Sequence, residues 1–153
     1  MIIDGTRIWK TLYQGGTPIE GSRLCKNGFD ILVLMAEEIQ PEAWKFPGIH
    51  VIRLPMRDEP TLLTPQQINL VRGVSRELSR HLACGRRVLV TCRAGLNRSG
   101  LVVAATLLRA STMSPVEAIQ TIRRHRSAKA LSNPAFVHAI VTEMRHDHDR
   151  PSI

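Results

Sequence analysis

The sequence predicts a single α/β domain over residues 1–153, with a mostly parallel central sheet of about four to five strands and helices on both of its faces. Residues 29–35 form a nearly continuous apolar run, which is typical of a central parallel strand covered on both sides. Residues 99–109 are apolar all round, which indicates a helix buried through the middle of the domain. The length of 153 residues suits one domain with a sizeable core.

The N-terminal third predicts elements in the order strand, helix, strand, strand. Residues 7–12 mix β-formers with polar residues and run into a Gln-Gly-Gly turn, so we expect a short strand or hairpin at the sheet edge. A helix of about residues 18–26 follows, because a proline suits its first turn and an Asn-Gly pair suits its end. A short irregular or helical piece at about residues 41–46 then precedes a strand at 49–54.

The second half predicts a short strand at 88–90 and, besides the buried helix, three amphipathic helices. Thr64-Pro65 is a cap and first-turn pair that opens a helix to about Ala83. Ser114 and Pro115 open another helix to about Arg124, and an Asn-Pro pair opens the last one at residue 133. The residues expected to face the core from these helices are Ile68, Val71, Val74 or Ser75, Leu78, Leu82, Val116, Ile119, Ile122, Phe136, Ile140 and Met144.

The charge balance favours anionic partners. The chain has 21 Lys and Arg residues against 13 Asp and Glu residues, which gives a formal net charge of +8. Such an excess suits phosphorylated proteins, nucleic acid or an acidic membrane surface. The densest basic run, residues 123–126, is more typical of a solvated helix end than of a binding patch, and His81 is interpreted as a group at a helix C-terminus.

The cysteines and the apolar runs indicate the cellular compartment in which the protein is expected to work. Cys25, Cys84 and Cys92 are odd in number and widely spaced, so they predict neither a disulfide framework nor a metal-ligand cluster. We expect Cys84 to be buried and the protein to work in the reducing cytoplasm. No apolar run approaches the ~20 residues of a membrane span, and the N-terminus lacks the pattern of a signal peptide.

Residues 87–100 predict a strand, a tight loop and a helix N-terminus in direct succession. This geometry gathers backbone N–H groups in one concavity, where the helix dipole adds positive potential. A thiol at the start of the loop, Cys92, would be stabilised there as the thiolate, and Arg98 at its end offers a planar fork for phosphate oxygens. A lone cysteine after a strand is more often a small buried residue, but Gly95, Arg98 and Ser99 favour a nucleophile in a phosphate-binding loop.

The segment from Cys92 to Arg98 resembles the Cys-x5-Arg signature of the cysteine-based protein tyrosine phosphatase superfamily. The longer match, Cys-x-Ala-Gly-x-x-Arg-Ser-Gly, resembles the dual-specificity phosphatases, and it implies a tyrosine phosphatase-like fold. One position departs from the pattern, because the family usually has His before the cysteine and this chain has Thr91. Threonine offers a hydroxyl but no positive charge, so activation of the thiolate is left to the loop amides, the helix dipole and Arg98.

A candidate proton donor follows another strand. The charged turn at 55–60 comes directly after the strand at 49–54, and the carboxyl ends of parallel strands share one edge of a sheet. We therefore expect Asp58 to face Cys92 and to serve as general acid, and its loop resembles the general-acid loop of dual-specificity phosphatases. Two alternatives remain open: Glu59 as the acid, or Asp58 as a turn residue that pairs with Arg57.

The motifs together predict hydrolysis of phosphomonoesters through a cysteinyl-phosphate, with no metal and no cofactor. The resemblance further implies that Ser99 stabilises the departing thiolate, and that Asn133 helps to position water, although a helix N-cap explains Asn133 equally well. The residues predicted to bind phosphate, through backbone N–H groups and the arginine side chain, are Arg93, Ala94, Gly95, Leu96, Asn97 and Arg98.

The expected substrates are proteins that carry phosphotyrosine, phosphoserine or phosphothreonine, because a chain this short has no long insertion to build a deep pocket. Arg93 resembles a feature of phosphoinositide phosphatases in the same superfamily. Residues 95–99 resemble the loop of RNA 5′-triphosphatases, which lack the loop aspartate. A non-catalytic phosphate-binding module is a further alternative, supported by Thr91 alone.

Overall fold

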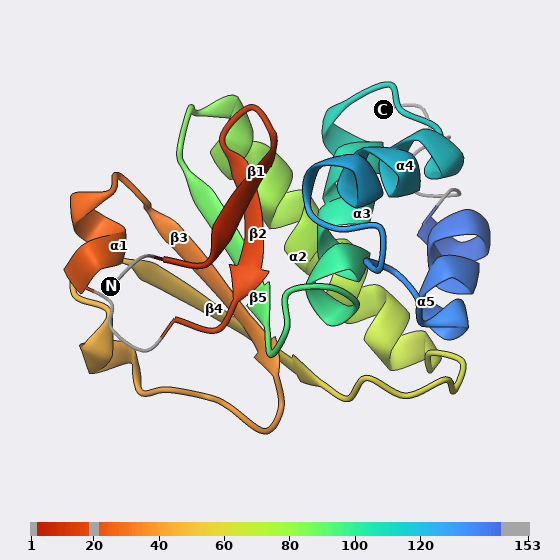
Figure 1. Ribbon diagram of the computed structural model, residues 1–153, viewed down its shortest axis with the longest axis horizontal. Coiled ribbons are helices and arrows are strands. Elements are labelled where there is room, and N and C mark those ends of the chain that lie inside the picture. Colours follow the sequence, from red (N-terminus) through yellow and green to blue (C-terminus); the bar gives the residue numbers. More distant parts are fainter. Residues whose placement is uncertain (1–2, 19–21, 145–153) are drawn as a thin grey trace.

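A five-stranded sheet with the strand order β1-β2-β5-β3-β4 divides the molecule into layers in the computed structural model, which describes residues 3–18 and 22–144 (Figure 1). Strand β1 is antiparallel to β2, and all other neighbouring strands are parallel. The predicted α/β class and mostly parallel sheet are thereby confirmed. The strands are β1 Gly5–Trp9, β2 Leu12–Gly16, β3 Ile31–Ala36, β4 His50–Met56 and β5 Val88–Cys92.

The register of the sheet brings the carboxyl ends of four strands to one edge. Cys92 at the end of β5 pairs with Gly16 of β2, and Thr91 pairs with Leu34 of β3. Because β4 runs parallel to β3, the loop that follows Met56 leaves the sheet at this same edge. The edge predicted to carry the chemistry therefore exists as one continuous rim.

Helices cover both faces of the sheet, as predicted (Figure 1). A small core forms on the face of α1, where Leu24 packs with Phe29, Phe46 and alternate side chains of β3. A larger core forms between the other face and the helices of the second half of the chain. The helical elements are α1 Ser22–Lys26, the 3₁₀ helix η1 Ala43–Lys45, α2 Pro65–Ala83, α3 Arg98–Ala110, α4 Pro115–His125, α5 Pro134–Ala139 and the π-helical turn η2 Ile140–Met144.

Helix α3 runs through the larger core, and every residue from Arg98 to Leu108 is buried. The buried hydroxyl of Thr106 in the middle of this helix donates to the carbonyl of Val102 at 2.7 Å. A helix surrounded on all sides holds its N-terminus rigidly, because any tilt would open voids in a close-packed interior. This confirms the prediction of a buried helix behind the signature segment.

Three expectations about elements need correction or lie outside the described residues. Helix α1 begins at Ser22, and the start predicted at residue 18 includes residues 19–21, which the structure does not describe. Val116 is 58% exposed, because it lies in the first turn of α4 just after the Ser114 cap and faces away from the core. Cys84 is exposed, because it is the C-cap residue of α2.

Within residues 3–18 and 22–144, no helix combines the length of a membrane span with sufficient hydrophobicity.

Candidate active site

Cys92 begins the signature loop (residues 92–98) as the last residue of β5, and it is only 2% exposed. Its Sγ lies 3.3 Å from the Oγ of Ser99, in the first turn of α3. Gln14 Nε2 donates to that Oγ at 3.2 Å, so the hydroxyl proton of Ser99 is left to donate to the sulfur when Cys92 is a thiolate. The structure thus brings Cys92 and Ser99 together at the place where the sequence predicts them.

Gly95 allows the signature loop to turn against β2. Its φ angle is +70°, in the left-handed region that favours glycine. A Cβ atom at Gly95 would lie 2.4 Å from the carbonyl carbon of Gly15 and 2.6 Å from its oxygen. Both the backbone angle and the close approach therefore require glycine at this position.

The carbonyl oxygens of the signature loop point toward donors of the surrounding protein. Arg126 Nη2 donates to the oxygen of Ala94 at 3.1 Å, and its Nε donates to that of Gly95 at 3.0 Å. The N–H of Leu131 donates to the oxygen of Leu96 at 3.2 Å. Because successive carbonyls face these donors, we infer that the loop N–H groups face the other side and form a concavity for an anion.

Arg126 braces this loop, and the sequence analysis missed its role. We expect a solvated helix end at 123–126, but only 11% of the Arg126 side chain is exposed. Its two terminal nitrogens donate to the Asp4 carboxylate at 2.7 and 3.0 Å. These hydrogen bonds lower the pKa of Asp4 below its ordinary value, against the opposing effect of burial. No signal within the run could reveal a partner 122 positions away.

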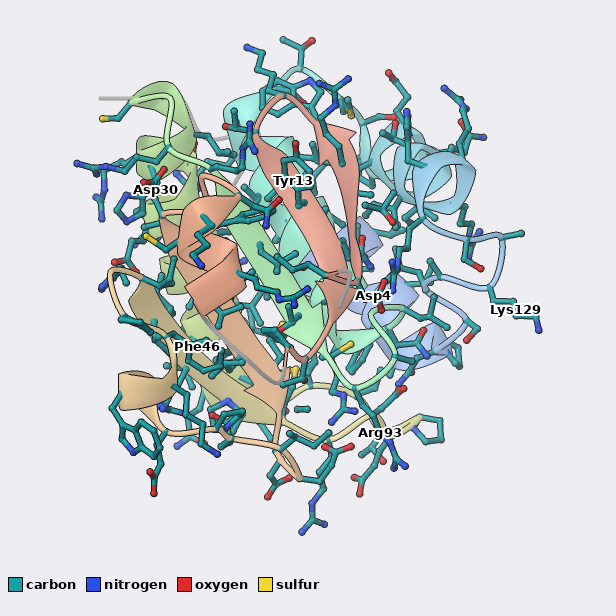
Figure 2. All side chains as sticks on the ribbon, turned by 60° about the vertical axis from the view of Figure 1, so that its left-hand side comes forward. Asp4, Tyr13, Asp30, Phe46, Arg93 and Lys129 are labelled. Carbon is teal, nitrogen blue, oxygen red and sulfur yellow. The ribbon has the colours of Figure 1, made fainter. Side chains whose placement is uncertain are left out.

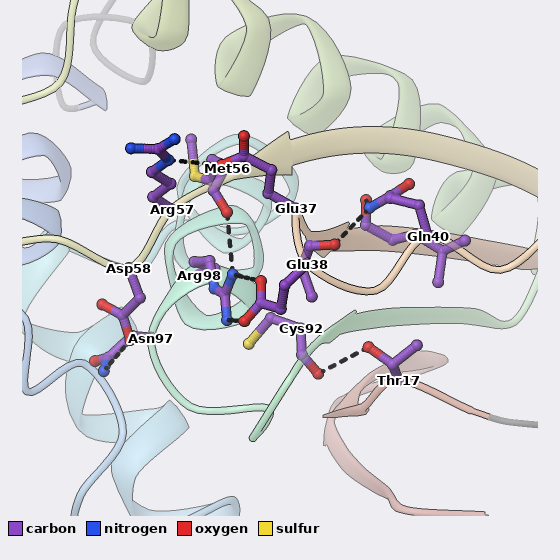
Figure 3. Close-up of polar contacts among 12 residues, drawn as sticks. Thr17, Glu37, Glu38, Gln40, Met56, Arg57, Asp58, Cys92, Asn97 and Arg98 are labelled. Atoms are coloured by element: carbon purple, nitrogen blue, oxygen red, sulfur yellow. Dashed lines mark hydrogen bonds and ion pairs between the residues drawn. The ribbon is translucent and has the colours of Figure 1, made fainter.

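Arg98 lies at the other end of the signature loop and is 5% exposed. Its Nη1 and Nη2 donate to the two carboxylate oxygens of Glu38 at 2.5 and 2.9 Å, and Nη1 also donates to the carbonyl of Met56 at 3.0 Å (Figure 3). Its Nε is buried and has no hydrogen-bond partner among the described residues. One donor of the buried guanidinium is thus left unsatisfied.

Glu38 was not predicted as a site residue. It follows β3 at the carboxyl edge of the sheet, and its hydrogen bonds with Arg98 lower the pKa of its carboxyl to about 2, with a smaller contribution from the charge of Arg93. The same hydrogen bonds raise the pKa of Arg98. Its position just after a central strand is the one signal that sequence reasoning could have used.

Asp58 lies beside the signature loop, in the connection between β4 and α2 (the Asp58 loop, residues 57–64). Its Oδ2 accepts a hydrogen bond from Asn97 Nδ2 at 3.0 Å (Figure 3). Its Oδ1 accepts one from Asn133 Nδ2 at 2.8 Å. Asn133 is the N-cap of α5, as its sequence context suggests, and its Oδ1 accepts from the N–H of Ala135. One asparagine therefore caps a helix and holds the aspartate, a second function that the sequence did not reveal.

The neighbours of Asp58 form a separate group of ion pairs at the surface. Arg57 Nε lies 3.1 Å from a carboxylate oxygen of Glu37, and Arg57 Nη1 lies 3.6 Å from one of Glu59. Arg57 therefore pairs with Glu37 and Glu59, and the choice between Asp58 and Glu59 as the acid stays a prediction.

Thr91 and Arg93 flank the nucleophile position. Thr91 is fully buried, and its hydroxyl donates to the carbonyl of Val33 in β3 at 2.7 Å. The hydroxyl of Thr91 therefore forms a hydrogen bond within the sheet. Arg93 is exposed at the outer side of the signature loop, and Figure 2 shows it at the surface of the molecule. Arg93 therefore adds positive charge at the outer side of the signature loop.

The site opens into a pocket of about 530 Å³ in which acidic groups outnumber basic ones. The pocket is lined by Glu37, Glu38, Arg57, Asp58, Glu59 and Arg98.

Comparisons with known proteins agree with this geometry. Residues 12–145 match the family described as dual specificity phosphatase, catalytic domain. The chain is 39% identical over 84 residues to the mouse phosphatidylglycerophosphatase and protein-tyrosine phosphatase 1, which covers 55% of this chain and 42% of that protein. The human protein of the same name is 36% identical over 86 residues, with 56% and 41% covered. The matches therefore span less than half of the length of either relative.

Solved structures share the fold. The crystal structure of human DUSP28 superposes with a TM-score of 0.80, at 21% identity and with 98% of both chains covered. The crystal structure of PTPMT1 in complex with PI(5)P gives a TM-score of 0.79 at 24% identity, over 93% of this chain and 94% of that one.

The fold and the Cys-x5-Arg loop together define a domain of the cysteine-based protein tyrosine phosphatase superfamily. Within that superfamily, the chain belongs to the dual-specificity phosphatase family. The structure assembles Cys92, Arg98, Ser99 and Asp58 at one edge of the sheet, and their chemical roles stay predictions.

Proposed function

We propose that the chain hydrolyses phosphomonoesters in two steps through a cysteinyl-phosphate intermediate. The placement of Asp58 carries this proposal, because its carboxylate accepts a hydrogen bond from Asn97 of the signature loop. A nucleophile, an anion-binding loop and a proton donor then border the same small volume, which is the set of groups that displacement at phosphorus requires.

In the first step, the sulfur of Cys92 attacks phosphorus while the bond from phosphorus to the leaving oxygen breaks. The loop amides and Arg98 hold the equatorial oxygens as negative charge develops on them. Asp58, protonated, transfers its proton to the leaving alcohol or phenol oxygen.

In the second step, Asp58 is a carboxylate and takes a proton from a water molecule that attacks the phosphorus. The sulfur–phosphorus bond breaks and inorganic phosphate is released. The Ser99 hydroxyl, 3.3 Å from Sγ, donates to the departing thiolate and so stabilises it.

Phosphorylated proteins are the substrate class that we propose first. Alkyl and phenolic leaving groups of phosphoserine, phosphothreonine and phosphotyrosine need a proton donor, and the contact of Asp58 with Asn97 of the signature loop supports Asp58 in that role. The carboxylates of Glu37, Glu38 and Glu59 disfavour polyphosphates such as an RNA 5′-triphosphate.

A phosphorylated lipid headgroup is a second candidate. It is supported by the similarity to phosphatidylglycerophosphatase and protein-tyrosine phosphatase 1 and by the fold shared with PTPMT1, which was solved with PI(5)P. The net charge of +8 and Arg93 at the rim would suit an anionic membrane surface.

The three cysteines are free in the structure, and the mechanism needs Cys92 reduced. We therefore propose a reducing compartment such as the cytoplasm as its place of action, which subcellular fractionation would test.

The first experiment measures turnover of an aryl phosphate under reducing conditions by the wild type and by Cys92→Ser, Arg98→Ala, Ser99→Ala and Asp58→Ala. We expect Cys92→Ser to abolish turnover and Asp58→Ala to lower it by about 10²- to 10⁴-fold on substrates with poor leaving groups. No turnover by a folded wild type would instead favour a phosphate-binding module. Phosphopeptides, phosphatidylglycerophosphate, PI(5)P and triphosphate-ended RNA would then be compared as substrates.

A further inference from the structure

Two histidines and a glutamate meet at the end of the sheet opposite to the signature loop. His50 begins β4, whereas Glu77 and His81 lie one turn apart near the end of α2. The Nε2 of His50 lies 3.4 Å from Oε1 of Glu77, and the Nε2 of His81 lies 3.9 Å from the same oxygen. One ligand atom from each residue falls within 4.8 Å of the other two.

These separations suit a small tetrahedral metal ion. Zinc binds histidine nitrogen and carboxylate oxygen at about 2.0–2.2 Å, so two ligand atoms of a tetrahedral site lie about 3.4 Å apart. The His50–Glu77 distance has this value, and the His81–Glu77 distance of 3.9 Å is about 0.5 Å longer. The two histidine nitrogens lie within 4.8 Å of each other, so this third separation is at most about 1.4 Å too long. Side-chain rotations would close both gaps, because the side chains of His50 and Glu77 are 55% and 37% exposed.

A neutral imidazole is the form that binds metal. Arg86 Nη1 lies 2.9 Å from His81 Nδ1, and because arginine can only donate, the ring proton is on Nε2. Metal binding at Nε2 therefore requires exposed Arg86 to move away and the ring proton to shift to Nδ1.

We propose that His50, Glu77 and His81 bind one divalent transition-metal ion of the Zn²⁺ class, with water in the fourth position. Two imidazoles and one carboxylate are a ligand set that zinc accepts in proteins. No metal-ligand cluster was expected from the sequence, because His50 is 27 positions away from Glu77 and only the tertiary structure brings the two side chains together.

The ion would act as a structural clip. Strand β4, the Asp58 loop and α2 form one continuous segment, with Asp58 at the turn and the three ligands at its two ends. Binding to the folded state alone raises thermal stability, and at a hundredfold excess over Kd the expected rise in Tm is about 5–10 °C.

Calorimetric titration with Zn²⁺ tests the proposal in the Cys92→Ser variant, because the active-site thiolate would otherwise compete for the metal. We expect one ion per chain, and X-ray absorption of the zinc complex should show nitrogen and oxygen ligands without sulfur. In this background, His50→Ala, Glu77→Gln and His81→Ala should each weaken the affinity at least about tenfold. Arg86→Ala should strengthen it, because the competing donor to His81 is gone.

Two matched controls use histidines outside the cluster. His138→Ala removes an exposed imidazole from α5, and the double variant His146→Ala/His148→Ala removes those of the tail, which lies outside the described residues. Both should bind zinc like the parent. The proposal would be overturned if the three cluster variants bound zinc as tightly as the Cys92→Ser parent, or if either control lost zinc binding. Glu77→Gln keeps the shape of a surface side chain, so its Tm without metal checks that the variant is folded.

Discussion

At the scale of single residues, Glu38 governs the position of the Arg98 guanidinium. Both terminal nitrogens of the arginine are occupied by this carboxylate, which leaves Nε as its unpartnered donor. A buried arginine held from one side in this way keeps its charge and its orientation before any substrate binds.

Replacing Glu38 by Gln should destabilise the fold, because Arg98 would remain buried without a balancing charge. Breaking a fully buried pair costs about 3–5 kcal/mol. Because the Glu38 side chain is 43% exposed, we expect a smaller loss of about 1–3 kcal/mol in the free energy of unfolding. Urea denaturation measures it, and Glu37→Gln, whose partner Arg57 is at the surface, should change stability by under about 0.5 kcal/mol. Equal losses in the two variants would contradict the argument.

The same ion pair predicts how stability depends on pH. The pKa of the Glu38 carboxyl falls from 4.5 to about 2 on folding, so at acidic pH the unfolded chain binds a proton more readily than the folded one. The contribution of Glu38 is therefore complete above about pH 4.5 and is lost as the pH falls through about 2. The difference in unfolding free energy between wild type and Glu38→Gln should shrink over this range. A difference that stays constant from pH 6 to pH 2 would refute this assignment.

At the scale of elements, the site depends on how the signature loop and the Asp58 loop meet at the carboxyl edge of the sheet. The signature loop lies against β2 at Gly15, and the Asp58 loop is held by Asn97 and by the N-cap of α5. Rigid strands and helices therefore hold both loops, and the candidate catalytic residues lie where these loops come together at the edge of the sheet.

Gly95→Ala tests the contact between the signature loop and β2. An added Cβ would overlap the Gly15 carbonyl and would also face the backbone strain of a φ of +70°. We expect the loop to shift and kcat/KM on an aryl phosphate to fall at least about 100-fold. Gly85→Ala is the control, because its φ is +76° but nothing lies within 4 Å of the added atom. It should cost about 1–2 kcal/mol in stability and leave kcat/KM unchanged.

Asn133→Asp separates the two functions of that residue. An aspartate can still cap α5 through an oxygen that accepts from the N–H of Ala135, but it cannot donate to Asp58 and would repel it. We expect stability to change by less than about 1 kcal/mol, with kcat falling about 10- to 100-fold on alkyl phosphates. The loss should be smaller on p-nitrophenyl phosphate, whose leaving group needs less protonation. An equal loss on both substrates would show that Asn133 does not act through the acid.

At the scale of the whole molecule, Arg126 links parts of the chain that are far apart in sequence. It joins the start of the chain at Asp4 and the end of α4 to the carbonyls of Ala94 and Gly95 in the signature loop. The loop is therefore stiffened by the complete fold as well as by the strand and helix on its two sides.

Arg126→Lys should release these contacts, because a lysine cannot reproduce the fork that serves a carboxylate and two carbonyls at once. We expect a loss of about 1–3 kcal/mol in unfolding free energy and weaker inhibition by inorganic phosphate. Arg124→Lys, an exposed change in the same helix, is the control and should alter neither quantity. Unchanged phosphate inhibition in Arg126→Lys would show that the brace does not shape the anion site.

Much of the site was predictable because its central motif is local. Cys92, Arg98 and Ser99 lie within one strand-loop-helix unit, so their proximity follows from secondary structure alone. The apolar run of β3 and the capped helix α2 were predictable for the same reason, since periodicity and capping act over a few residues. Asp58 required one further rule, that parallel strands end at a common edge.

What the sequence by itself determined was the α/β class, the signature loop and the candidate nucleophile, because each is encoded in consecutive residues. Only the tertiary structure decided the partners of these groups. Arg98 meets Glu38 across 60 positions, Asn133 meets Asp58 across 75, and Arg126 meets Asp4 across 122. A polar or charged residue can serve many sites, and which partner it takes depends on the packing of distant elements against one another.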